Sequence, residues 1–166
     1  MDKLIPFTIN DLAKVTNHRS GEIKFGEKMI IIPKGIDKIN FLKESDAKYV
    51  LLGIPEDIGV RANYGRPGTA SAWECAIKSI ANIQHNRFSK GSQIIVLGHI
   101  NVSEEMRDVE NLDFNDIDDR SKLSQLVEKI DKEVSHIIFN IIKAGKTPII
   151  IGGGHNNAYG NIKGSA

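Results

Sequence analysis

Short, almost continuous apolar runs alternate along the chain with longer segments in which apolar residues recur every three or four positions. The runs occupy residues 48–55 (KYVLLGIP), 92–100 (SQIIVLGHI) and 147–151 (TPIII). Uninterrupted runs of this length are typical of parallel strands that are buried on both faces. The pattern therefore predicts three buried strands of one parallel sheet.

The segments between these runs carry the spacing of amphipathic helices. The first helix is predicted to begin at an S-x-x-E capping box formed by Ser71 and Glu74. The second is predicted over residues 123–142 and is stopped by Gly145 and Pro148. The two apolar faces consist of Trp73, Ala76, Ile77, Ile80 and Ile83, and of Leu123, Leu126, Val127, Ile130, Val134, Ile137, Ile138 and Ile141.

The order of these elements predicts the fold class. Strand, helix, strand, helix and strand in succession favour parallel pairing with right-handed crossovers. We therefore expect an α/β fold of three layers, a parallel sheet with helices on both faces. Residues 58–69 and 103–120 are rich in polar and glycine positions and are predicted to be loops. In such folds ligands bind beyond the carboxyl ends of the strands.

The composition limits the classes of partner that the protein is expected to bind. The chain has 166 residues, with 22 basic and 21 acidic side chains. No lysine- or arginine-rich block is present, so the charge pattern favours neither nucleic acid nor anionic lipid. No run approaches the roughly 18 apolar residues of a membrane-spanning helix, and the start lacks a signal-peptide pattern. We expect a cytoplasmic protein with a small-molecule or protein partner. Cys75 is predicted to be a buried, inert thiol.

The sequence divides into two regions of different character. Residues 1–46 are predicted to be a mixed, polar N-terminal extension without assigned function, whereas residues 47–166 form the α/β domain. The chain stops inside the helix predicted after the third strand, so we expect the domain to be truncated after that strand. An uncovered sheet edge would favour a homo-oligomer. The helix at 123–142 either contributes to that interface or is buried against its own sheet.

Polar and glycine residues follow each predicted strand. Since the carboxyl ends of parallel strands meet at one edge of a sheet, these residues are expected to lie near one another. They are Glu56, Asp57, Arg61, Asn63 and Arg66 after the first strand, His99 and Asn101 at the second, and Gly152, Gly153, Gly154, His155, Asn156 and Asn157 after the third.

His155 has two interpretations of about equal weight from its chemistry alone. The preceding glycines allow tight backbone turns that could aim a neutral imidazole over the sheet edge as a metal ligand. Alternatively, Asn156 or Asn157 caps the next helix and His155 only makes a local hydrogen bond. His99 is predicted to be a strand-end histidine without a catalytic role.

The sequence GGGHNN also resembles the start of a G-x-G-x-x-G dinucleotide-binding loop. Asn157 stands where the third glycine belongs, and no acidic residue follows about 20 positions later. A nucleotide-binding domain with a degenerate glycine loop is therefore a lower-ranked alternative.

The motifs together resemble the ureohydrolase family, which includes arginases, agmatinases and formimidoylglutamases. The resemblance rests on LLGIPEDIGVRANYGRPGTASAWECAIKSI, on IIVLGHI, and on AGKTPIIIGGGHN, in this order from Lys48 onward. The motif RANYGRPGT after the first strand is more similar to the formimidoylglutamase branch. What the resemblance implies is an arginase-like domain and a binuclear manganese hydrolase that acts on a small-molecule amidine. In such enzymes two metal ions activate a shared hydroxide.

The resemblance also implies residue roles. His155 corresponds to the metal-ligating histidine of the family's G-G-x-H motif. From their position at the strand ends, Glu56 and Asp57 are expected to line the substrate side of the crevice, and the substrate-binding candidates are Arg61, Asn63, Asn156 and Asn157. The family's other five ligands lie in Asp-x-His-x-Asp and Asp-x-Asp segments, which this chain lacks. We therefore expect little or no activity from this chain alone. A non-catalytic α/β interaction module is the main alternative.

Overall fold

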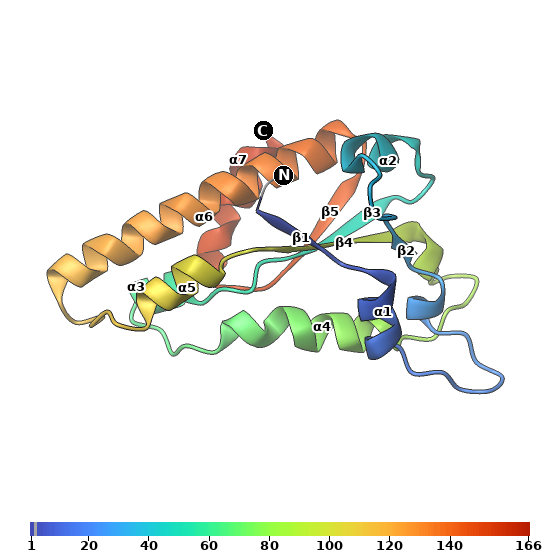
Figure 1. Ribbon diagram of the computed structural model, residues 1–166, viewed down its shortest axis with the longest axis horizontal. Coiled ribbons are helices and arrows are strands. Elements are labelled where there is room, and N and C mark those ends of the chain that lie inside the picture. The colour runs from blue at the N-terminus through green and yellow to red at the C-terminus, as the bar shows by residue number, and fades with distance from the viewer. Residues whose placement is uncertain (2) are drawn as a thin grey trace.

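A five-stranded sheet runs through the middle of the molecule, between two layers of helices (Figure 1). The computed structural model describes Met1 and residues 3–166. Strands β3, β4 and β5 are parallel, β2 is parallel to β4, and β1 is antiparallel to β4. This confirms the predicted α/β fold with a mainly parallel sheet. The strands are β1 (Leu4–Pro6), β2 (Ile30–Ile31), β3 (Tyr49–Gly53), β4 (Ile94–Ile100) and β5 (Thr147–Ile151).

The central strand β3 shows why its sequence is apolar throughout. Val50 and Leu52 point into the core beneath the long helix α6 (Ile117–Lys143), whereas Leu51 joins the core on the opposite face. Gly53 lies against the ring of Trp73, where a Cβ atom would come within 2.4 Å of the indole. Both faces of the strand are therefore covered, as the uninterrupted run predicts.

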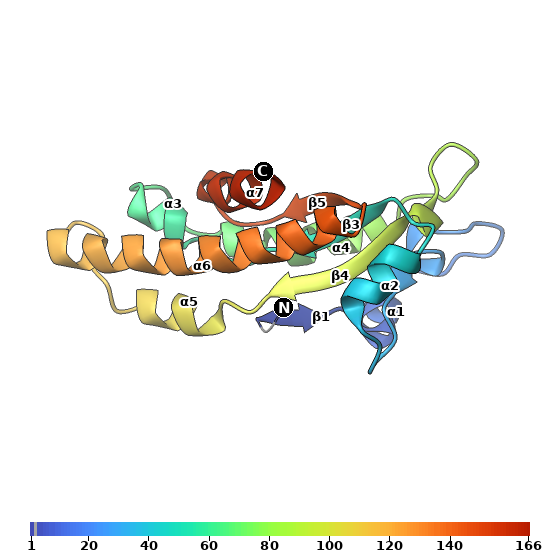
Figure 2. The same cartoon turned by 90° about the horizontal axis from the view of Figure 1, so that it is seen from above.

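The helices form a layer on each side of the sheet. Helices α6, α2 and α7 lie on one face, and α4 and α1 lie on the other (Figure 1). Seen from above, α7 runs alongside α6 (Figure 2). The helices are α1 (Ile9–Val15), α2 (Lys38–Glu44), α3 (Ile58–Ala62), α4 (Ala72–Ala81), α5 (Ser103–Val109), α6 and α7 (Ala158–Ser165), with short 3-10 turns η1 (Phe25–Glu27), η2 (Thr69–Ser71), η3 (Gly91–Gln93) and η4 (His155–Asn157).

Helix α6 confirms the strongest helix prediction and begins earlier than predicted. Asp116 caps it, because one carboxylate oxygen accepts the backbone N–H groups of Asp118 and Asp119 at 2.9 and 3.0 Å. Its apolar stripe, from Leu123 to Ile141, is buried in the core of its own chain. The structure thus shows burial against its own sheet, the second of the two roles considered for this helix.

Four local predictions are wrong, each for a local reason. Residues 58–69 and 103–120 are not simple loops, because the short helices α3 and α5 and the start of α6 lie within them. Ser71 already has helical dihedrals after η2, so its side chain does not cap α4; its hydroxyl instead donates to the carbonyl of Gly68. Cys75 is exposed, since it faces away from the side of α4 that packs on the sheet.

The N-terminal residues contribute to the same sheet. Strands β1 and β2 both pair with the outer side of β4, β1 near its carboxyl end and β2 nearer its start. Helix α1 follows β1 and carries a capping box between Thr8 and Asp11. The division into an extension and a domain stays a prediction. Within the part of the chain that the structure describes, no helix is long and apolar enough to cross a membrane.

Candidate functional site

The loops after β3 and β5 leave the sheet side by side. These strands pair in parallel, with Gly53 opposite Ile151, and the pairing continues where Ile54 N–H donates to the Ile151 carbonyl at 2.8 Å. The loop after β3 is therefore in direct contact with residues 152–157, which we call the glycine turn. This confirms the predicted convergence for two of the three strand ends.

The glycine turn has a backbone that other residues adopt only with strain. Gly152 and Gly153 have φ values of +129° and +61°. A Cβ atom on Gly152 would lie 2.4 Å from the Ile54 carbonyl oxygen, and one on Gly153 would lie 2.4 Å from a Glu56 carboxylate oxygen. The glycines are thus needed both for the turn and for its close approach to the β3 loop.

Glu56 is the residue that joins the two loops. Its side chain is fully buried. One carboxylate oxygen accepts the backbone N–H groups of Ile58 and Gly59 at 2.7 and 3.2 Å. The other accepts Gly154 N–H at 3.1 Å, Asn157 Nδ2 at 2.6 Å and Asn156 Nδ2 at 3.5 Å. We call this set of contacts the Glu56 brace.

Asp57 holds the far side of the β3 loop. This buried carboxylate accepts the Arg61 Nε–H at 2.6 Å and the backbone N–H of Gly68 at 2.8 Å. The Arg61 guanidinium also lies over the ring of Phe114, 5.4 Å from its centroid. Glu56 and Asp57 are therefore internal supports of the loop, not residues that line an open crevice.

His155 is exposed at the start of η4, directly after the glycines. Its imidazole makes no hydrogen bond or ion pair with any residue that the structure describes. The ring lacks the second hydrogen-bond partner that usually orients a metal-ligating histidine. The local hydrogen bond of the alternative interpretation is not formed either, so the ligand role of His155 stays a prediction.

The predicted substrate-binding residues fall into two groups. Asn63 is exposed at the end of α3, and Arg61 is half-buried beside it. Asn157 is buried in the Glu56 brace, and Asn156 is half-buried, with its Oδ1 atom lacking a partner among the described residues. Asn157 stands at the N-cap position of α7, although its side chain makes no capping hydrogen bond.

The end of β4 contributes differently. The ring of His99 packs beside Trp73, at 6.3 Å between centroids, and burial lowers the pKa of this imidazole. Asn101 accepts the backbone N–H and hydroxyl of Ser103 at the start of α5. Neither side chain bonds to the glycine turn in the described residues, so the third strand end does not join the candidate site through a hydrogen bond.

The residues present do not complete a metal centre. Among the residues that the structure describes, no three His, Cys, Asp or Glu side chains are grouped so that they could hold a metal ion. The carboxylates of the β3 loop, Glu56 and Asp57, already accept N–H groups, Glu56 from both loops and Asp57 from its own. His155 can supply one ligand, but a pair of manganese ions does not fit this chain alone.

The fold and the glycine turn together define an α/β protein whose candidate site lies beyond the carboxyl ends of parallel strands. Comparison with known proteins specifies the family: residues 47–166 match the arginase family, and the chain belongs to it. The resemblance inferred from the motifs is thereby confirmed.

A curated relative agrees with this assignment. The chain is 29% identical over 122 residues to a formimidoylglutamase from Hahella chejuensis (strain KCTC 2396). The matched stretch covers 74% of this chain and 30% of the relative. The chain thus spans less than a third of the length of the curated relative that it matches.

The glycine turn argues against the nucleotide-binding alternative. A phosphate would need free backbone N–H groups at the turn. Here the Gly154 N–H already donates to the Glu56 carboxylate, which places a negative charge of the protein itself at that position. From the sequence alone, Glu56 is one of several polar residues at strand ends, and its partners could not be predicted. Its position beside Asn157 at one sheet edge was the available signal.

Proposed function

We propose that the protein is an amidine hydrolase, that its substrate is a formimidoyl compound, and that His155 is one of its manganese ligands. Membership of the arginase family and the similarity to a formimidoylglutamase support the reaction class. The observation that carries the assignment of the site is the exposed, unbonded imidazole of His155 on a turn braced against the β3 loop.

The chain's own residues would bind and orient the substrate. The Arg61 Nε–H is taken by Asp57, while its two Nη groups have no hydrogen-bond partner among the described residues. A guanidinium held in this way suits a carboxylate, which favours an amidine that carries an acidic group. The exposed side chain of Asn63 would contact the polar amidine end. When bound, the metal pair would supply an activated hydroxide.

A manganese titration followed by NMR tests the role of His155. Mn²⁺ is paramagnetic and broadens the signals of a ring that it contacts. Because one imidazole is a weak site, we expect selective broadening of the His155 ring without tight binding. The variant His155→Ala should abolish the effect, while His136→Ala, which removes another exposed histidine on α6, should not.

Equal broadening of His136 and His155 would refute the assignment of the ligand. Turnover belongs to the whole protein, so ammonia release from formimidoyl and guanidino compounds should be measured on a chain that includes the segments with the remaining ligands. The cytoplasmic location and the homo-oligomer stay predictions.

A further inference from the structure

Glu56 occupies an unusual position for a charged residue. It is fully buried, and its hydrogen-bond partners are N–H groups of uncharged backbone and amide groups. A buried carboxylate without a cation needs several N–H donors to replace its hydration. Here the donors come from two loops that are about 100 residues apart in sequence and that are both bonded by this carboxylate.

The contacts are arranged around the residue that carries the candidate chemistry. Gly154 precedes His155 and Asn156 follows it, and both donate to the same Glu56 oxygen. The third donor to that oxygen is Asn157, the shortest contact of the set. The backbone on both sides of His155 is therefore held by one carboxylate, whereas the imidazole itself is free.

We propose that Glu56 is a positioning residue that fixes the backbone from which the His155 side chain extends, by holding the glycine turn. This inference rests on the proposed function of His155. Glu56 does not touch the imidazole; it acts through the Gly154 amide and the side chains of Asn156 and Asn157. Its second oxygen anchors the turn to the rigid start of α3 through Ile58 and Gly59.

Amide hydrogen exchange of the purified chain tests this role, with the variant Glu56→Gln. A glutamine has nearly the same shape but only one acceptor oxygen, so it cannot accept from both loops. We expect the Gly154 amide to exchange at least about tenfold faster, the change expected from loss of one hydrogen bond to a charged group. Its proton resonance should also move toward the position of a solvent-exposed amide.

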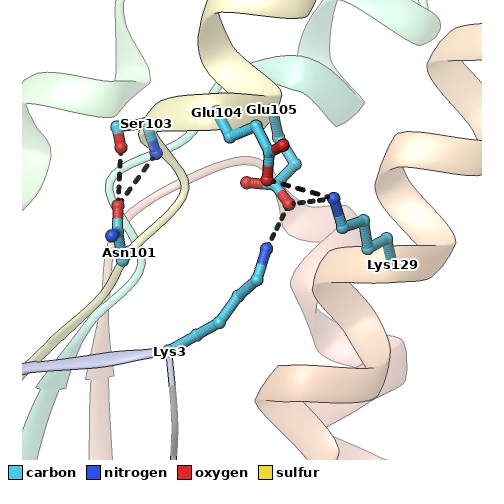
Figure 3. A network of polar contacts seen from close by, with 6 residues as sticks. All are labelled: Lys3, Asn101, Ser103, Glu104, Glu105 and Lys129. Carbon is cyan, nitrogen blue, oxygen red and sulfur yellow. Dashed lines mark hydrogen bonds and ion pairs between the residues drawn. The ribbon is translucent and has the colours of Figure 1, made fainter.

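A second buried carboxylate provides the matched control. Glu105 in α5 is 1% exposed and is bonded by Lys3 and by Lys129 of α6, neither of which belongs to the Glu56 brace (Figure 3). The variant Glu105→Gln removes a buried charge of the same type without touching the brace. It should leave the Gly154 resonance in place, with exchange changed only as far as global stability changes.

If Glu56→Gln does not fold, Asn157→Ala removes the shortest arm of the brace and leaves Glu56 with its other donors. This variant should increase the exchange rate of the Gly154 amide in the same way. An unchanged Gly154 amide in whichever variant folds would overturn the inference, and so would equal loosening by Glu105→Gln.

The Mn²⁺ titration distinguishes failure of this inference from failure of the proposed function. If Mn²⁺ broadens His155 in the wild type, Glu56→Gln should weaken that effect, because the backbone that carries the ring is less ordered. If Mn²⁺ does not broaden His155 in the wild type, the assigned ligand role fails, while the exchange of Gly154 still decides whether Glu56 orders the turn.

Discussion

Two buried glutamates, Glu56 and Glu105, are held by opposite means. Glu56 accepts N–H groups from uncharged donors at the ends of β3 and β5. Glu105 instead meets the ammonium groups of Lys3 and Lys129, which tie β1 and α6 to the start of α5 (Figure 3). The lysine side chains remain 28% and 47% exposed.

The two sets of donors differ more in how precisely they are placed than in how they balance the charge of the glutamate. An ammonium on a flexible stem tolerates small shifts, whereas fixed backbone N–H groups define both the distance and the direction of the bond. Burial alone would raise the pKa of Glu105, but the hydrogen bonds from Lys3 and Lys129 outweigh it and hold that pKa below its ordinary value. Ion pairs with two lysines thus hold Glu105 at the periphery, whereas several fixed N–H donors hold Glu56 at the candidate site.

The largest effect is expected from crowding the Glu56 brace. In Gly153→Ala the new methyl group meets Glu56 and Asn157 at less than 2.5 Å and also requires a positive φ. Gly145→Ala is the matched control, because its φ is +76° but its surroundings are open. The Gly153 variant should lose about 1–3 kcal/mol more stability than the control in urea unfolding, the typical cost of overpacking. Equal losses would show that the brace yields easily.

A smaller effect is expected from Glu105→Gln. Removal of this carboxylate leaves two lysines that can turn toward solvent, so the loss should be about 1–2 kcal/mol, below the usual cost of breaking a buried pair. Because the lysines are partly exposed, 1 M NaCl should reduce the difference between wild type and variant. A loss that does not change with salt would indicate packing as the cause.

The smallest effect concerns Asp131, another buried carboxyl group, which has neither a lysine partner nor a set of several N–H donors. Its Oδ1 atom has no partner among the described residues. Burial and the charge of Glu56 raise its pKa, and the amide of Gly160 and the charge of Lys163 only partly oppose this. Its contribution to stability is therefore present below its ordinary pKa and is lost as the pH rises through the raised value.

Asp131→Asn should accordingly gain about 1 kcal/mol at pH 7, the lower end of the cost of an unpaired buried polar group. The gain should shrink as the pH is lowered from 7 toward 4. Glu128→Gln, which changes an exposed acid in the preceding turn of α6, is the control and should leave stability close to that of the wild type. A gain independent of pH would contradict the assigned titration.

The sequence predicted the parts of the fold that have a strong periodic pattern. The runs at β3, β4 and β5 and the stripe of α6 extend over enough residues to be recognised without tertiary information. Helices α3 and α5 have only five and seven residues, so periodicity cannot identify them. Their positions depend on contacts such as the bonds from Ile58 and Gly59 to Glu56.

The candidate site was predicted less completely. Motif order placed His155 at the end of β5, and parallel pairing placed it near the β3 loop. The roles of Glu56 and Asp57 as internal supports could not be predicted, because a carboxylate beside a strand end looks the same whether it faces solvent or is buried. Only the approach of Asn157 to Glu56, 101 positions away, distinguishes the two cases.

The separation of Glu56 and Asn157 along the sequence also affects how the protein folds. Pairing of β3 with β5, and with it the brace, closes a chain segment of nearly 100 residues. The entropy of closing so long a segment is lost before its contacts can form. The Glu56 bonds to the glycine turn are therefore expected to form late in folding, unlike the local turns of α6. An ordered backbone around His155 is expected only once β3 and β5 have paired.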